Sequence, residues 1–288
     1  MIMGQHAIHS LALGSIYALL AVGLTFMYGA QRSLAIAYGG LYAVGSYVAW
    51  WTVRSNRPLW VALGLAVLLC TLVGVLLHWG VRIARAHTAE RSTLLAGLGG
   101  LICLGEVCRW VIGPYHMKVI AVDSHQIHHL GPLMVTDMHW LVFGCVFALF
   151  VSVQGFLTLS HSGRAVQALL TPAIVLESPP GEVSCSRLLA CGLGAAMAGL
   201  SGVLAGLYLN DVYPAMGMHV THKMLSIVLI GVLGSLRGAL LVAFGLALVE
   251  GVILPATRLP VPSEAVILPA LALASIAQTW GRSADIRL

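Results

Sequence analysis

Apolar stretches of roughly 20 residues, separated by short polar connections, fill most of the chain. Each has about the length that an α-helix needs to cross the ~30 Å hydrocarbon core of a bilayer. We therefore predict an all-α, polytopic membrane protein that forms a single domain over residues 1–288. Eight or nine transmembrane or partly re-entrant helices are expected, at residues 8–28, 33–53, 59–81, 93–113, 140–160, 188–209, 224–236, 239–254 and 263–279. The first is expected to be a retained helix, because no small-residue cleavage site follows it.

Two of these segments are weak crossings. Residues 224–236 are few for a full span, and residues 33–50, SLAIAYGGLYAVGSYVAW, are rich in glycine and tyrosine. Broken helices are tolerated in a membrane where protein or a water-filled cavity satisfies the backbone. The glycines of the second segment are explained equally well by close helix packing and by a narrow path beside the backbone. The candidate pathway-lining residues here are Tyr38, Gly39, Tyr42, Gly45, Ser46 and Tyr47.

Composition supports the membrane assignment, because 59% of residues are apolar and 9% are charged, against about 25% charged in soluble domains. The net charge of +5 is interpreted as a topology signal rather than a nucleic-acid surface. If all nine segments cross and the N-terminus is outside, nine basic residues face the cytoplasm and six face outward. The first group is Arg32, Arg82, Arg85, Arg91, Arg164, Arg187, Arg237, Arg282 and Arg287; the second is Arg54, Arg57, Arg109, Lys118, Lys223 and Arg258. This bias predicts a cytoplasmic C-terminus.

A few ionisable residues lie within apolar segments, where each is costly unless paired or facing water. Glu106 and Arg109 are three residues apart on one helix, which fits either local pairing or a place along the pathway. Glu250 and Lys223 leave the same two alternatives open. None belongs to a ladder of charges typical of a proton-coupled transporter or a voltage sensor, so energy is expected to come from a partner if transport is active.

Other chemistry is less favoured by the residues. The cysteines have no metal-ligand spacing, and GLSG at residues 199–202 resembles an intramembrane protease motif but lacks a histidine in the later helices. We expect no catalytic site, no metal and no cofactor. Histidines gather in the expected outer connections, where a zinc site and external pH sensing are alternatives to a solvated loop: His116, His125, His128, His129, His139, His219 and His222.

Two later stretches indicate helix contacts. Gly194, Ala198, Gly202 and Gly206 recur every four residues and form a stripe that favours close helix packing. GRAVQALL, within the loop at about residues 161–187, reads as a short helix between two spans, and a short helix in a partner's groove is a common recognition mode.

Taken in order, several blocks of the sequence resemble the permease subunits of ABC importers for branched-chain amino acids, and the related urea and amide permeases. The blocks are GSIYALLAVGLTFMYG, the glycine-rich stretch at residues 33–50, GRAVQAL, GAAMAGLSGVLAGLYLNDVYPAMG and LIGVLGSLRGALLVAFGLALVEG. The resemblance implies a bacterial inner-membrane subunit that works with a second permease, two cytoplasmic ATPases and an extracytoplasmic binding protein. It also implies an ATPase-coupling role for Gly163, Arg164, Ala165 and Ala168. The chain has no GxxxxGK[ST] motif, so ATP would be bound by the partners.

The departures from the family pattern are informative. Ala35, Tyr38 and Gly40 stand where the family has Asn, His and Glu, and Thr171 and Pro172 replace acidic residues. Pro179 and Pro180 are expected to break the helix that follows. A substrate other than the family's usual one and altered coupling both fit these changes. The alternative function is an ATPase-independent channel or facilitator for a small polar solute.

Overall fold

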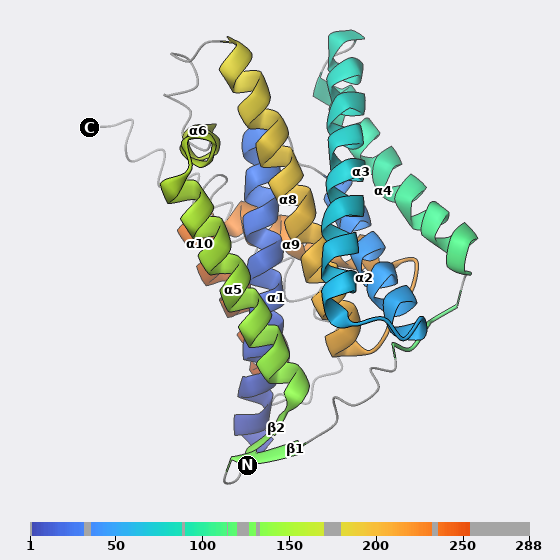
Figure 1. Ribbon diagram of the computed structural model, residues 1–288, viewed down its shortest axis with the longest axis vertical. Helices are drawn as coiled ribbons and strands as arrows, with labels where there is room; N and C mark the ends of the chain where they lie inside the picture. The colour runs from blue at the N-terminus through green and yellow to red at the C-terminus, as the bar shows by residue number, and fades with distance from the viewer. Residues whose placement is uncertain are drawn as a thin grey trace.

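The computed structural model describes residues 2–31, 36–87, 90–113, 115–119, 127–130, 133–169, 180–231 and 236–253. Helices dominate this part of the chain (Figure 1). They are α1 (Ile2–Gln31), α2 (Tyr38–Arg54), α3 (Leu59–His87), α4 (Glu90–Ile112), α5 (Asp137–Leu159), α6 (His161–Leu169), α8 (Pro180–Leu209), α9 (Met216–Ile230) and α10 (Leu236–Leu248), with a π-helical segment, η1 (Val249–Ile253). A two-stranded antiparallel hairpin, β1 (Ile127–Leu130) and β2 (Leu133–Thr136), precedes α5.

Among the described residues, five helices are long and apolar enough to cross a membrane. They cover Gly4–Gln31, Leu59–Ile83, Leu94–Ile112, Asp137–Leu159 and Cys185–Leu209. The predicted class, a polytopic helical membrane protein, is therefore confirmed. The segment expected at residues 263–279 lies outside the described residues.

The degree of burial separates central helices from peripheral ones. In α1, 94% of the apolar window is buried inside the chain, and in α8 78%, against 22% in α3 and 17% in α4 and α5. Lipid is as apolar as a protein core, so the peripheral helices can leave apolar side chains exposed without penalty. Figure 1 shows α1 between α5 and α8, with α3 and α4 farther out.

Small residues bring the central helices into backbone contact. On α8, a Cβ at Gly202 would collide with the carbonyl oxygen of Tyr42 and lie 3.0 Å from the backbone nitrogen of Ser46, both on α2. Gly194 faces α1 in the same way, where a Cβ would lie 2.6 Å from the oxygen of Gly23. The stripe formed by Gly194, Ala198, Gly202 and Gly206 thus faces both α1 and α2, with Ala198 fully buried.

The two weak segments are short helices. The 17 residues of α2 span about 26 Å and the 15 of α9 about 22 Å, less than the ~30 Å of hydrocarbon. Their first turns touch, since a Cβ at Gly217 would lie 2.5 Å from the oxygen of Gly39. The weak segment at residues 224–236 was expected to begin at Met224, which is wrong, because α9 begins at Met216. Lys223, which was counted above among the outward-facing loop cations, therefore lies within a helix.

Polar connections gather at one end of the bundle. The backbones of Met117 and Val212 form an antiparallel bridge, with N–H···O distances of 2.8 and 2.9 Å, which ties the segment after α4 to the α8–α9 connection. Figure 1 shows the hairpin and the beginning of α1 at one end of the molecule and α6 at the other.

Pro180 does not interrupt a helix. It is the first residue of α8, a position where proline is tolerated because the first-turn N–H groups have no intrahelical partner. The expectation that this proline breaks the following helix is therefore wrong; Thr171, Pro172 and Pro179 lie outside the described residues.

Candidate functional site

An ion pair and a tyrosine hydroxyl connect three helical segments, α1, α9 and η1. The ammonium of Lys223 on α9 lies 2.5 Å from Oε1 of Glu250 in η1. The Tyr17 hydroxyl of α1 donates to Oε2 of Glu250 at 3.0 Å and accepts from Lys223 at 3.1 Å. The Lys223 and Glu250 side chains are only 16% and 22% exposed. The sequence singled out both charges without pairing them, and it gave no sign of Tyr17.

A cavity of about 310 Å³ opens beside this ion pair. Its walls come from α1, α2, α8, the α8–α9 connection and α9, and Lys223 and Tyr17 belong to them. The volume is at the lower end of the range of roughly 300–1,000 Å³ that is usual for small-molecule sites. The remaining lining residues are Leu13, Ile16, Tyr42, Ala205, Leu209, Asp211, Tyr213, Met216, His219 and Val220.

A second cavity, of about 390 Å³, lies between α2, α4 and the start of α9. Glu106 and Arg109 line it, and their side chains pair at 3.4 Å while remaining about half exposed. The local pairing foreseen for these two residues is present, and the other alternative, a place along the pathway, stays a prediction. Tyr213 lines both cavities.

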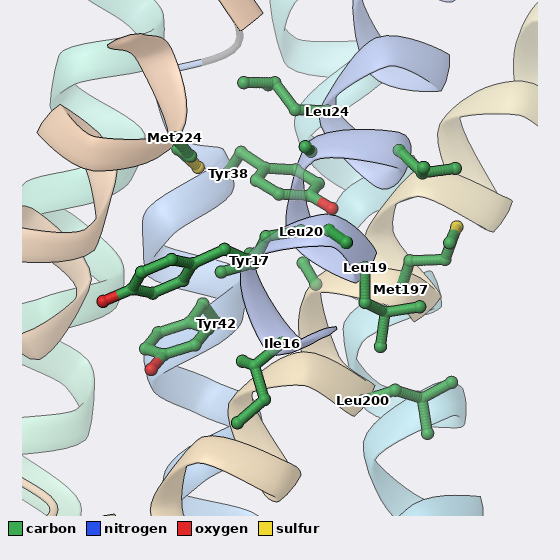
Figure 2. Packing of buried hydrophobic residues seen from close by; sticks show 14 of the residues in the cluster. Ile16, Tyr17, Leu19, Leu20, Leu24, Tyr38, Tyr42, Met197, Leu200 and Met224 are labelled. Atoms are coloured by element: carbon green, nitrogen blue, oxygen red, sulfur yellow. The ribbon is translucent and has the colours of Figure 1, made fainter. Parts of the chain in front are cut away.

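The tyrosines of α2 differ in what they face. Tyr42 lines the smaller cavity, whereas Tyr38 and Tyr47 are buried and are not among the lining residues of either cavity. Figure 2 shows the hydroxyls of Tyr17 and Tyr42 directed to one side and that of Tyr38 to the other. The pathway role of Tyr38 and Tyr47 stays a prediction, since neither lines one of these two cavities.

The small residues predicted along the same path contact neighbouring helices. A Cβ at Gly39 would collide with the carbonyl oxygen of Gly217 on α9, and one at Gly45 with that of Gly199 on α8. The hydroxyl of Ser46 donates to the oxygen of Gly202 at 2.8 Å. Of the two explanations that the sequence left open for these glycines, close packing is the one with contacts to support it.

The histidines have specific neighbours. His116 Nδ1 lies 3.1 and 3.3 Å from the carboxylate oxygens of Asp211, and its ring stacks on Tyr213 with a centroid distance of 4.5 Å. Within the described residues, no group of three or more His, Cys, Asp or Glu side chains is placed to hold a metal ion. His139 lies on α5, His219 and His222 on α9, and His128 and His129 in β1, while His125 is outside the described residues.

The short helix α6 presents one face outward. Gly163, Val166 and Leu169 are buried against the bundle, and a Cβ at Gly163 would lie 2.8 Å from Cα of Leu157 on α5. Arg164 is exposed on the opposite face, with Ala165 and Ala168 half-buried beside it. A rigidly seated helix with an exposed cation at one end of the bundle is suited to contact another protein.

The fold and the cavities together indicate the class of protein. A multi-pass helical bundle that encloses cavities with a buried charge is the architecture of a membrane transporter or channel. The chain matches the family model described as branched-chain amino acid transport system / permease component over residues 7–276. The protein belongs to this family, and the resemblance drawn from the sequence blocks is confirmed.

Individual relatives agree with this assignment. The chain is 25% identical over 263 residues to the high-affinity branched-chain amino acid transport system permease protein LivH of Escherichia coli K12, covering 85% of this chain and 84% of that protein. It is 26% identical over 254 residues to the corresponding protein BraD of Pseudomonas aeruginosa, covering 82% and 81%. The similarity thus extends over most of both chains.

Proposed function

We propose that this chain is the permease subunit of an ABC importer that moves branched-chain amino acids, or related small polar solutes such as urea and amides, into the cell. The observation that carries the proposal is the cavity beside Lys223, read together with the family match over residues 7–276. The apolar walls of the cavity suit the aliphatic side chain of a solute, and the lysine and tyrosines suit the polar groups of that solute.

The energy for transport would come from partners. The proposed complex contains a second permease, which is either another chain or a second copy, two cytoplasmic ATPases that bind ATP, and an extracytoplasmic binding protein. The exposed face of α6, with Arg164, supports a docking role for this helix. The proposed orientation in the bacterial inner membrane has the α6 end and the C-terminus in the cytoplasm and the N-terminus outside. The loss of acidic residues at Thr171 and Pro172 leaves an ATPase-independent channel as the competing function.

The test is co-purification with the ATPases followed by uptake measurements in vesicles, using leucine, urea and short amides. Replacing both Arg164 and Ala168 by glutamate places charge and bulk on α6 and should abolish ATPase binding and ATP-dependent uptake. Lys118→Glu is the matched control, because Lys118 is also an exposed cation but lies near the opposite end of the bundle. Equal ATPase recovery with the double variant and the control would contradict the assignment of α6.

A further inference from the structure

We propose that Lys223 binds the carboxylate of a small zwitterionic amino acid in the adjoining cavity, and that Glu250 holds this ammonium until the substrate arrives. The proposal rests on the transport function proposed above and narrows its substrate class. It assigns roles to the two charges that the helices enclose.

Lys223 is placed to serve two partners. A lysine ammonium has three N–H donors. Two are used by Glu250 and Tyr17, and the third has no protein acceptor among the described residues. Lys223 lines the cavity, whereas Glu250 does not, so a solute in the cavity approaches the ammonium from another direction than Glu250 does.

Tyr17 is placed to ease the exchange. Its hydroxyl contacts both members of the ion pair and also lines the cavity. A phenol that now donates to Glu250 can rotate its O–H toward an arriving carboxylate without leaving the ammonium. Glu250 itself stands in a π-helical segment, a local widening that occurs frequently at functional sites.

Charge balance selects a zwitterion over an anion or a cation. The Lys223–Glu250 pair is neutral, and an uncompensated charge in a membrane interior is costly. A carboxylic acid anion would leave one excess negative charge beside the pair, and an amino acid amide would bring a cation and offer Lys223 only a neutral carbonyl oxygen. A zwitterion supplies the carboxylate and adds no net charge.

The cavity also offers a place for the ammonium of the substrate. Asp211 lines it, on the α8–α9 connection, and its carboxylate, which also contacts His116 at 3.1 and 3.3 Å, is opposite in sign to Lys223. The same walls carry apolar side chains that suit an aliphatic side chain: Leu13, Ile16, Ala205, Leu209, Met216 and Val220. The chemistry of the walls therefore matches all three parts of an aliphatic amino acid.

The test measures binding of radiolabelled L-leucine to the full-length chain in nanodiscs, with any subunits that co-purify. L-leucinamide and 4-methylpentanoate serve as competitors that lack the carboxylate and the ammonium. Leucine should bind at least tenfold more tightly than either competitor. Leucinamide loses the charge-assisted hydrogen bond to Lys223, and 4-methylpentanoate leaves its negative charge unbalanced. Equal binding of leucine and leucinamide, or no leucine binding, would overturn the proposal.

Variants separate a binding role from a structural one. The double variant K223Q/E250Q removes both charges together and should weaken leucine binding at least tenfold. The single variant E250Q removes the competing carboxylate and should bind leucine at least as tightly as the wild type. The reversed pair K223E/E250K keeps an ion pair and should retain the thermal unfolding midpoint but lose leucine binding. Wild-type affinity in the reversed pair or in K223Q/E250Q, or a loss in E250Q equal to that in K223Q/E250Q, would contradict the assignment.

Failure of this site and failure of the importer proposal can be told apart, because leucine binding requires no ATP. Leucine binding that follows the predicted order without ATP-driven uptake would contradict the importer and leave the site. ATP-driven uptake with leucine affinity unchanged in K223Q/E250Q would contradict the site and leave the importer.

Discussion

Replacing Gly45 by alanine should destabilise the bundle, because this glycine allows α2 to touch the backbone of α8. A Cβ at this position would lie 2.8 Å from the carbonyl carbon and from Cα of Gly199, and still closer to the oxygen. All three neighbours are backbone atoms of a helix, which cannot rotate away as a side chain can. The two helices must therefore separate to admit the methyl group.

The expected cost follows from three contributions. Overpacking of a tight contact costs about 1–3 kcal/mol. Separation also stretches the 2.8 Å hydrogen bond from the Ser46 hydroxyl to Gly202, and such bonds average about 0.6 kcal/mol in a membrane protein. Alanine regains up to about 1 kcal/mol of helix propensity over glycine. The net loss of unfolding free energy should be about 1–3 kcal/mol.

The assay is unfolding of the purified protein by titration with a denaturing detergent, followed by tryptophan fluorescence. Gly144→Ala is the matched control, because Gly144 is also in a helix but a Cβ there has no neighbour within 4 Å. The control should be unchanged or up to about 1 kcal/mol more stable. If Gly45→Ala were as stable as Gly144→Ala, the backbone contact between α2 and α8 would be refuted.

Three further predictions concern other parts of the molecule. Arg109→Gln should change the unfolding free energy by less than about 0.5 kcal/mol, because the pair with Glu106 is half exposed. Slower uptake without a change in stability would assign Arg109 to the transport pathway. A larger loss of stability would contradict the exposed geometry of the pair. Gly163→Val should unseat α6 from α5 and reduce the amount of co-purified ATPase, and full recovery of ATPase would show that this seating is not needed. His116→Ala should speed hydrogen exchange at the Met117 and Val212 amides by loosening the loop that His116 anchors on Asp211, while exchange in α1 stays unchanged; equal rates would show that the backbone bridge is independent of His116.

The bundle could be predicted from sequence because its signal is local. Apolar stretches of about 20 residues give the long helices directly, and the excess of glycine correctly marked α2 as unusual. The boundary of α9 was misplaced because His219, His222 and Lys223 interrupt the apolar pattern. A cation is tolerated there only because a carboxylate and a phenol from other helices satisfy it.

The candidate site depends on contacts between distant parts of the chain. Lys223 meets Glu250 across 27 positions and Tyr17 across 206, and no feature of the intervening sequence encodes either contact. Tyr213 lines two cavities, one of which needs α1, α2, α8 and α9 to be packed and the other α2, α4 and α9. The hairpin of β1 and β2 was missed because its eight residues lie in a connection where apolar periodicity has too few positions to be recognised.

Accumulation of leucine against a concentration gradient decides whether this chain is the permease of an ATP-driven importer. Proteoliposomes would hold this subunit with the second permease and the two ATPases, with ATP on the ATPase side and the binding protein with labelled leucine on the other. An importer should accumulate leucine above its outside concentration, and this accumulation should stop without ATP. Leucine that only equilibrates, at the same rate with or without the ATPases, would contradict the importer and establish a channel.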